Sequence, residues 1–259
     1  PGEQVHTHNV ATNLAGQLAY TYQPNFQAVV PHSTRQFLGY RRSDGQVGIR
    51  NDIWIIPTVG CVNNLATRLA NRTGGFALTH PYGCSQLGED HETTANLLAA
   101  LVRNPNAGGV LVVGLGCENN TLASFQERLG DCSSLNIRFM LAQEAGDEFE
   151  TGLALIAELE RGRVSTRTSV PVSELKIGLK CGGSDGFSGL TANPLVGRFS
   201  DWLVGEGGTT VLTEVPEMFG AETLLMNRCI NREVFEKCVA MINGFKSYYE
   251  SRNQVIYEN

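Results

Sequence analysis

The sequence predicts an α/β protein, and two patterns support that class. Short apolar runs that do not alternate with polar residues recur along the chain, as in strands buried on both faces of a sheet. Segments with apolar residues at helical spacing separate these runs. Strands that alternate with helices imply parallel sheets joined by right-handed crossovers. We therefore predict two Rossmann-like parallel-sheet units, preceded by the tail of a β-rich module.

The order of these patterns divides the chain into four segments. They are the tail of the β-rich module at residues 1–22, a linker at 23–37, a first α/β unit at 38–165 and a second α/β unit at 173–259. The boundary between the two units falls in the polar stretch Arg163–Val172. Because the chain begins at Pro1 rather than at a methionine and ends just after a helical pattern, we expect a fragment of a longer polypeptide, truncated at the C-terminus.

The first unit is predicted to begin with a hairpin and to continue with alternating strands and helices. Gly39–Asn51 has the pattern of a hairpin, with its turn at Ser43–Gly45. The predicted strands are Ile53–Thr58, Val110–Val113 and Ile137–Leu141. Apolar residues at helical spacing predict the helices, in four groups: Val62, Leu65, Ala66, Leu69 and Ala70, then Leu97, Leu98, Leu101 and Val102, then Leu122, Phe125 and Leu129, then Phe149, Leu153 and Ile156.

The second unit repeats this alternation. Its predicted strands are Leu175–Leu179 and Thr209–Thr213. A helix with Pro194 in its first turn is predicted between them, because apolar residues share one of its faces. These residues are Leu195, Val196, Phe199 and Leu203. Glu233–Tyr249 is predicted to be an amphipathic helix.

Composition disfavours several classes of partner. The net charge of −6 argues against nucleic acid and against anionic membranes. No apolar stretch approaches the roughly 20 residues that span a bilayer, and no signal peptide is visible. The seven cysteines form no CxxC pair, and their odd number argues for reduced thiols. We expect a cytoplasmic protein that binds a small molecule, as a monomer or as a homo-oligomer.

Four cysteines occupy the same kind of position in the predicted fold. Cys61, Cys84, Cys117 and Cys181 each follow an apolar run and precede a turn that opens a helix. If the runs are parallel strands, the four thiols approach the edge of a sheet at which the strands end. Ligands of open α/β sheets bind at that edge. The cysteines therefore predict where a site lies.

The densest cluster of titratable groups surrounds Cys84. His80 and His91 lie on either side of it, and Glu89 and Asp90 precede His91. An imidazole transfers protons near neutral pH, and a His or Cys side chain can bind a divalent metal ion. The alternative is that both histidines are ordinary polar loop residues and that Asp90 caps a helix.

For each of the other candidate binding residues, a purely structural role is the alternative. Asn119 either binds a substrate hydroxyl or caps the following helix. Ser184 and Asp185 lie in a glycine-rich turn that suits an anion at a helix N-terminus, or that is simply flexible. Arg42 either binds a substrate carboxylate or forms an ion pair with Asp44. His6 and His8 share a face if their segment is extended, as in half of a metal site or in a surface pair.

Four separated motifs resemble, in the same order, those of the altronate/galactarate dehydratase family, whose wider members include the large subunit of sulfolactate sulfo-lyase. The motifs are Phe37–Asn64, Thr79–His91, Gly114–Asn119 and Lys180–Asp185. The stretch His6–Asn13 is similar to the end of the small β-clip (SAF) domain that precedes the catalytic region in this family. The resemblance covers nearly the whole chain, and it implies that most of the β-clip domain and the family's C-terminal region are missing.

The resemblance implies a hydro-lyase that converts D-altronate to 2-dehydro-3-deoxy-D-gluconate with the help of Fe²⁺, or alternatively Mn²⁺. Removal of the C2 proton needs a base and groups that stabilise the enediolate, and the departing hydroxide needs an acid or a metal ion. We expect His80 or His91 to transfer the proton. The candidate metal ligands are His6, His8 and Cys84, and the candidate substrate ligands are Arg42, Asn119, Ser184 and Asp185. Dehydration of galactarate, elimination from sulfolactate, and binding of a sugar acid without turnover are the alternative functions.

Overall fold

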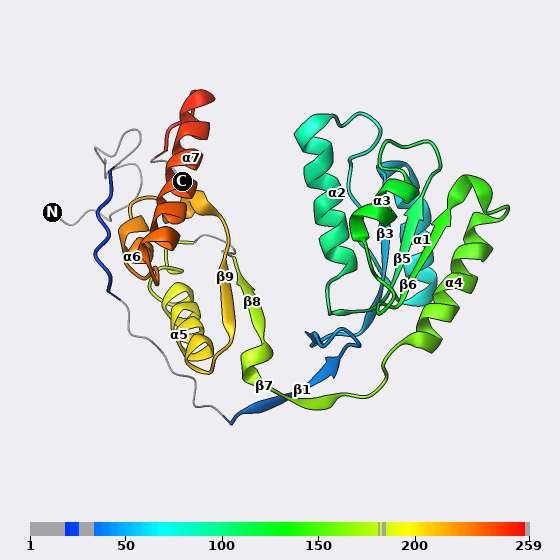
Figure 1. The fold of residues 1–259 in the computed structure, drawn as a ribbon, viewed down its shortest axis with the longest axis horizontal. Coiled ribbons are helices and arrows are strands. Elements are labelled where there is room, and N and C mark those ends of the chain that lie inside the picture. Colours follow the sequence, from blue (N-terminus) through cyan, green and yellow to red (C-terminus); the bar gives the residue numbers. More distant parts are fainter. Residues whose placement is uncertain (1–18, 26–33, 181, 183–184, 257–259) are drawn as a thin grey trace. The chain divides into compact units, whose positions relative to one another are not determined.

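The computed structural model describes residues 19–25, 34–180, 182 and 185–256, and it divides into two compact units. The first unit is Thr34–Glu174, and the second consists of the described residues from Leu175 onward together with residues 19–25 (Figure 1). Each unit contains a parallel sheet with helices, so the predicted α/β class is confirmed. The predicted tail of the β-rich module lies outside the described residues, apart from residues 19–22.

A four-stranded parallel sheet forms the centre of the first unit. Its strand order is β4-β3-β5-β6. The strands are β3 (Asp52–Pro57), β4 (Phe76–Ala77), β5 (Ala107–Gly114) and β6 (Ile137–Leu141). The three strands predicted in this unit are confirmed. The two-residue strand β4 was not predicted, because so short a run carries no periodicity.

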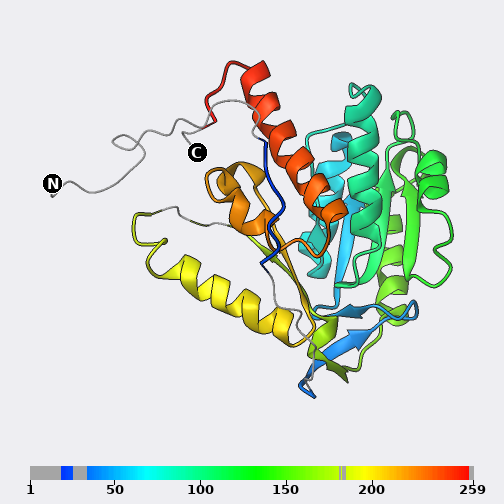
Figure 2. The same cartoon turned by 60° about the vertical axis from the view of Figure 1, so that its left-hand side comes forward.

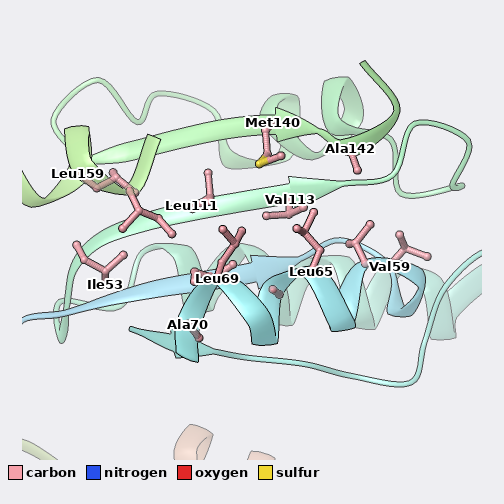
Figure 3. Close-up of a cluster of buried hydrophobic side chains, with 14 residues drawn as sticks. Ile53, Val59, Leu65, Leu69, Ala70, Leu111, Val113, Met140, Ala142 and Leu159 are labelled. Atoms are coloured by element: carbon pink, nitrogen blue, oxygen red, sulfur yellow. The ribbon is translucent and has the colours of Figure 1, made fainter. Parts of the chain in front are cut away.

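Helices cover both faces of this sheet. The helices are α1 (Asn63–Thr73), α2 (Gly88–Val102), α3 (Leu122–Leu129) and α4 (Glu148–Gly162). Leu111 and Val113 of β5 pack in the core under α1 and α4, whereas Val110 and Val112 pack under α2 and α3. Figure 3 shows the first of these cores, with side chains of β5 facing those of α1. Burial on both faces explains why the strand sequences do not alternate.

The predicted hairpin joins a small antiparallel sheet. Strand β1 (Gln36–Arg41) pairs with β2 (Val47–Gly48) on one side and with β7 (Thr168–Pro171) on the other. Strand β7 lies inside the polar stretch that was predicted to separate the units. It is an edge strand in which Val170 is buried and the other side chains are exposed. Short 3₁₀ turns occur at η1 (Gly60–Val62), η2 (Ala142–Glu144), η3 (Val172–Glu174) and η4 (Val215–Met218).

The second unit has a two-stranded parallel sheet, β8 (Lys176–Leu179) and β9 (Thr209–Leu212). Its helices are α5 (Ala192–Gly205), α6 (Glu222–Met226) and α7 (Arg232–Ser251). The predicted apolar face of α5 is correct only at Leu203, which is fully buried, because Leu195, Val196 and Phe199 are exposed. Periodicity identifies an apolar face without showing what covers it. Among the described residues, no helix is both long and apolar enough to cross a membrane.

Candidate active site

Three loops meet at the edge of the first unit's sheet where β3, β4 and β5 end. They are residues 58–62, 78–87 and 115–121, which we call the carboxyl-edge loops. Each contains one of the predicted cysteines, and Cys61, Cys84 and Cys117 are all exposed free thiols. Cys181 lies outside the described residues. The expected position of three of the four cysteines is therefore confirmed.

Hydrogen bonds hold the carboxyl-edge loops to one another. The backbone N–H of Gly60 donates to the carbonyl oxygen of Tyr82 at 2.6 Å. The Asn63 amide, at the start of α1, donates to the carbonyl oxygen of His80 at 2.8 Å. The Asn119 amide donates to the carbonyl oxygen of Cys84, also at 2.8 Å. The edge is therefore a connected surface on which the position of each loop depends on the others.

The carboxylate of Glu118 is the centre of this network. It is buried, and it accepts hydrogen bonds from the Thr58 hydroxyl at 2.8 Å and from the backbone N–H groups of Leu115 and Gly116 at 3.0 and 2.6 Å. Burial alone would raise the pKa of Glu118, but these hydrogen bonds outweigh that effect and hold the pKa below its usual value. A Cβ added at Gly114 would lie 2.7 Å from Glu118 Oε1, so a larger residue there would displace the carboxylate.

His80 is held in a single tautomer by the loops. Its Nε2 lies 2.9 Å from the carbonyl oxygen of Pro57, at the end of β3. Because a carbonyl oxygen only accepts, Nε2 carries the proton and Nδ1 is the basic nitrogen. Nδ1 receives one long hydrogen bond, 3.3 Å from the backbone N–H of Tyr82. An imidazole oriented through one nitrogen, with its basic nitrogen weakly engaged, has the arrangement of a general base.

His91 lies in the first turn of α2, at the same edge. Its Nδ1 is 3.9 Å from a carboxylate oxygen of Glu92. Among the described side chains of the first unit, two buried polar atoms lack a hydrogen-bond partner, and they are His91 Nε2 and Asn63 Oδ1. Both belong to residues of this edge. Unpartnered buried polar atoms are rare in proteins, and a bound ligand is one way in which they are satisfied.

Two family models match the chain. The model described as D-galactarate dehydratase/altronate hydrolase, second domain, covers residues 39–162, and the model described as D-galactarate/altronate dehydratase, C-terminal, covers residues 172–259. The chain belongs to the D-galactarate/altronate dehydratase family. The carboxyl-edge loops lie entirely within the match to the family's second domain.

Named relatives show the same relationship over the whole chain. The sequence is 53% identical over 271 residues to altronate dehydratase of Bacillus subtilis, and 51% identical over 271 residues to altronate dehydratase of Escherichia coli. These matches cover all of this chain but 54% and 55% of the two relatives. The beta subunit of (2R)-sulfolactate sulfo-lyase from Chromohalobacter salexigens is 34% identical over 227 residues, which is 82% of this chain and 55% of that subunit. The chain thus spans about half the length of these relatives.

The other candidate residues are not all brought to this edge. Asp185 lies in the second unit, where its carboxylate accepts a hydrogen bond from the backbone N–H of Phe187 at 2.8 Å and so stabilises a turn. Ser184, His6 and His8 lie outside the described residues. Cys84 is at the edge, but among the described residues no three His, Cys, Asp or Glu side chains are grouped so that they could hold a metal ion.

Arg42 lies at the opposite end of the first unit's sheet from the carboxyl-edge loops. Its Nε donates to the carbonyl oxygen of Pro105 at 2.8 Å, just before β5, and its Nη1 donates to Asn51 Oδ1 at 2.8 Å, just before β3. Nη2 donates to the carbonyl oxygen of Arg50 at 2.9 Å. The guanidinium thus joins the hairpin to the amino ends of two strands. The Asp44 carboxylate, the expected alternative partner of Arg42, instead accepts hydrogen bonds from the backbone N–H and the side-chain amide of Gln46.

These contacts lead to a prediction for Arg42. Replacing Arg42 by Ala is expected to destabilise the first unit by about 2 kcal/mol, because three hydrogen bonds to the protein are lost. The Michaelis constant for a sugar acid should not change. Arg41→Ala is the matched control, since this exposed neighbour makes a single bond, to the Gly45 carbonyl oxygen. Urea unfolding and steady-state kinetics of both variants provide the measurement. A raised Michaelis constant without loss of stability would restore the substrate-binding role.

The lowered pKa of Glu118 leads to a second prediction. The ionised carboxylate stabilises the fold fully above its unfolded pKa, near 4.5, and this contribution is lost as the pH falls through the lower pKa of the folded state. Glu118→Gln should therefore be less stable than the wild type at pH 7, and the difference should shrink below about pH 4.5. Urea unfolding between pH 3 and pH 7 tests this. A difference that is constant with pH would contradict it.

Sequence reasoning did not predict that Thr58, Asn63 and Glu118 organise the edge. Two features of the sequence could have indicated this role. A glutamate directly after a buried strand and a glycine-rich turn must find hydrogen-bond donors, and the backbone of that turn supplies them. Asn63 lies two residues after Cys61, and Asn119 likewise lies two residues after Cys117.

Proposed function

We propose that the protein carrying this chain is a sugar-acid dehydratase that removes water from D-altronate to give 2-dehydro-3-deoxy-D-gluconate. Two relatives that match the whole chain at 53% and 51% identity are named altronate dehydratase. The observation that carries the assignment of the site is the Nε2 to Pro57 contact of His80, because it leaves a basic Nδ1 at the carboxyl edge of the sheet. Ligands of α/β sheets bind at that edge.

The reaction requires a proton to leave C2 and a hydroxyl group to leave C3. In the proposal, Nδ1 of His80 accepts the C2 proton, and the electron pair of that bond forms the C2–C3 double bond. The C3 hydroxyl departs with a proton donated by His91, so that water is released. The enol that remains takes up a solvent proton at C3 and loses its C2 hydroxyl proton to solvent, which gives the 2-keto acid. General acid and base groups of this kind typically contribute about 10²–10⁴-fold each.

The substrate must be oriented against His80. We propose that Asn119 binds a hydroxyl group, because its amide already fixes the Cys84 loop and its side chain is exposed at the edge. Ser184 and Asp185, in the glycine-rich turn after β8, are proposed to bind the carboxylate or a further hydroxyl group. A glycine-rich turn between a strand and a helix presents backbone N–H groups that suit an anionic ligand.

A ferrous ion, with Mn²⁺ as the alternative, remains a proposal of its own. The described residues alone do not form such a site, since no suitable group of three donor side chains occurs among them. We propose that His6 and His8 bind the ion with Cys84 as a further candidate ligand, and we assign no step of the reaction to it. Removal of metal by a chelator should lower the metal content and the activity together, and both should return with Fe²⁺.

The test is an assay of the purified protein that carries this chain against D-altronate, galactarate and sulfolactate. We expect a 2-keto-3-deoxy acid from D-altronate at the highest kcat/KM. Release of sulfite from sulfolactate would favour the sulfo-lyase reaction, for which the 34% identity to a sulfo-lyase subunit is the supporting observation. Binding of a hexonate without any product would indicate a sugar-acid-binding protein. A cytoplasmic location and a homo-oligomeric state remain predictions.

A further inference from the structure

Residues 19–25 pack against the second unit, although in sequence they precede the first. The Tyr22 hydroxyl donates to the carbonyl oxygen of Cys229 at 2.6 Å. The backbone N–H of Gln23 donates to Asn227 Oδ1 at 3.2 Å, and that of Asn25 donates to the Asn227 carbonyl oxygen at 2.7 Å. In both ribbon views the segment runs beside α6 and α7 (Figure 1, Figure 2). It therefore belongs structurally to a part of the chain some 200 residues away.

Tyr20 completes a buried ion pair. Lys246 of α7 and Glu222 of α6 are 1% and 3% exposed, and Lys246 Nζ lies 2.6 Å from Glu222 Oε1. The Tyr20 hydroxyl donates to the same carboxylate oxygen at 2.7 Å and accepts from Lys246 Nζ at 2.9 Å. Burial alone would raise the pKa of Glu222 and lower that of Lys246, but their mutual hydrogen bonds reverse both effects. Both groups are therefore charged at neutral pH.

A buried ion pair stabilises a fold only when its remaining hydrogen-bonding capacity is satisfied. The Tyr20 hydroxyl serves both members of the pair at once, since it donates to one and accepts from the other. The apolar contacts are equally specific. Tyr20 and Tyr22 pack against the core formed by Met226, Cys229, Phe235 and Ile242, and the Tyr22 and Phe235 ring centroids are 5.0 Å apart.

We propose that residues 19–25 act as a clasp that binds the polypeptide preceding Tyr20 to the second unit, with the Glu222–Lys246 pair as the receptor for the Tyr20 hydroxyl. The clasp explains why a charged pair is kept in a small core, where apolar residues would cost less to bury. The N-terminal region is then carried by the second unit rather than by the first unit, which follows it in sequence. This inference does not depend on the proposed catalytic activity.

The clasp can be tested by cutting the chain behind it. A protease recognition site is inserted between Asn25 and Thr34 of the whole chain, and the folded protein is cleaved there. We expect the N-terminal piece to stay bound, so that both pieces elute together in size-exclusion chromatography. Tyr20→Phe should speed dissociation of the piece by about 10- to 100-fold, because two buried charges each lose a hydrogen-bond partner. Immediate separation of the wild-type pieces would overturn the proposal.

Two controls separate a specific effect from damage to the fold. Tyr248→Phe removes a hydroxyl from an exposed tyrosine of α7 and should leave the dissociation rate unchanged. The double substitution Glu222→Leu with Lys246→Met removes the receptor pair, so that adding Tyr20→Phe should then change the rate by less than about twofold. If Tyr20→Phe raises the dissociation rate by the same factor with and without the Glu222–Lys246 pair, the Tyr20 hydroxyl does not act through the pair and the proposal is wrong. Near-UV circular dichroism of the uncleaved variants checks that each is folded.

Discussion

His80→Gln is expected to lower kcat for dehydration of D-altronate by about 10²–10⁴-fold in the protein that carries this chain. The substitution is chosen because the glutamine amide can still donate to the Pro57 carbonyl oxygen, which His80 Nε2 contacts at 2.9 Å. What is removed is the basic nitrogen, Nδ1. The carboxyl-edge loops should therefore keep their arrangement, and the Michaelis constant should change by much less than kcat.

The split between kcat and the Michaelis constant separates a lost base from a distorted loop. A lost base lowers kcat alone, whereas a distorted loop also raises the Michaelis constant. His91→Gln is the companion variant, because this histidine is the proposed acid at the same edge and makes no such backbone contact through Nε2. If both variants turn over at near the wild-type rate, neither histidine is the base.

Glu118→Ala is expected to have the largest effect on stability, a loss of roughly 3–5 kcal/mol in the free energy of unfolding of the first unit. Three donors lose their acceptor at once: the Thr58 hydroxyl and the backbone N–H groups of Leu115 and Gly116. Because these donors lie where β3 and β5 end, water can replace the carboxylate only in part. The loop that contains Cys117 and Asn119 should become mobile before the rest of the unit unfolds.

Urea unfolding followed by the fluorescence of Trp54 measures this effect. Trp54 lies in β3 of the first unit, and a Trp202→Phe background removes the signal of the second unit. Glu127→Ala is the control, since Glu127 is an exposed glutamate of α3. We expect a change within about 0.5 kcal/mol for the control. A similarly small change for Glu118→Ala would show that the buried carboxylate does not organise the edge.

The sequence was sufficient to predict the first unit's sheet because β5 is buried on both faces. Val110–Val113 form a continuous apolar run, as is typical of a strand between two helical layers. The same reasoning predicted that strand-end cysteines would gather at one edge. Leu97 is an exception, because it continues the apolar spacing of α2 but is 61% exposed. A spacing pattern marks the apolar face but not its width.

Contacts between residues distant in sequence could not be predicted from local patterns. Nothing around Arg42 indicates that its guanidinium binds the carbonyl oxygen of Pro105. The tautomer of His80 depends on Pro57, which lies 23 residues earlier in the chain. Residues 23–25 have the composition of a linker, yet they bond to Asn227. In each case a side chain or backbone group finds a partner that only the folded topology supplies.

In the proposed function, the carboxyl edge of the first unit carries out proton transfer at C2 of a sugar acid. The most direct measurement is dehydration of D-altronate in D₂O, with the product examined by mass spectrometry and NMR. We predict 2-dehydro-3-deoxy-D-gluconate that carries solvent deuterium at C3, formed by the wild type and nearly absent with His80→Gln. Binding of D-altronate without either product formation or exchange of its C2 hydrogen in the wild type would contradict the claim.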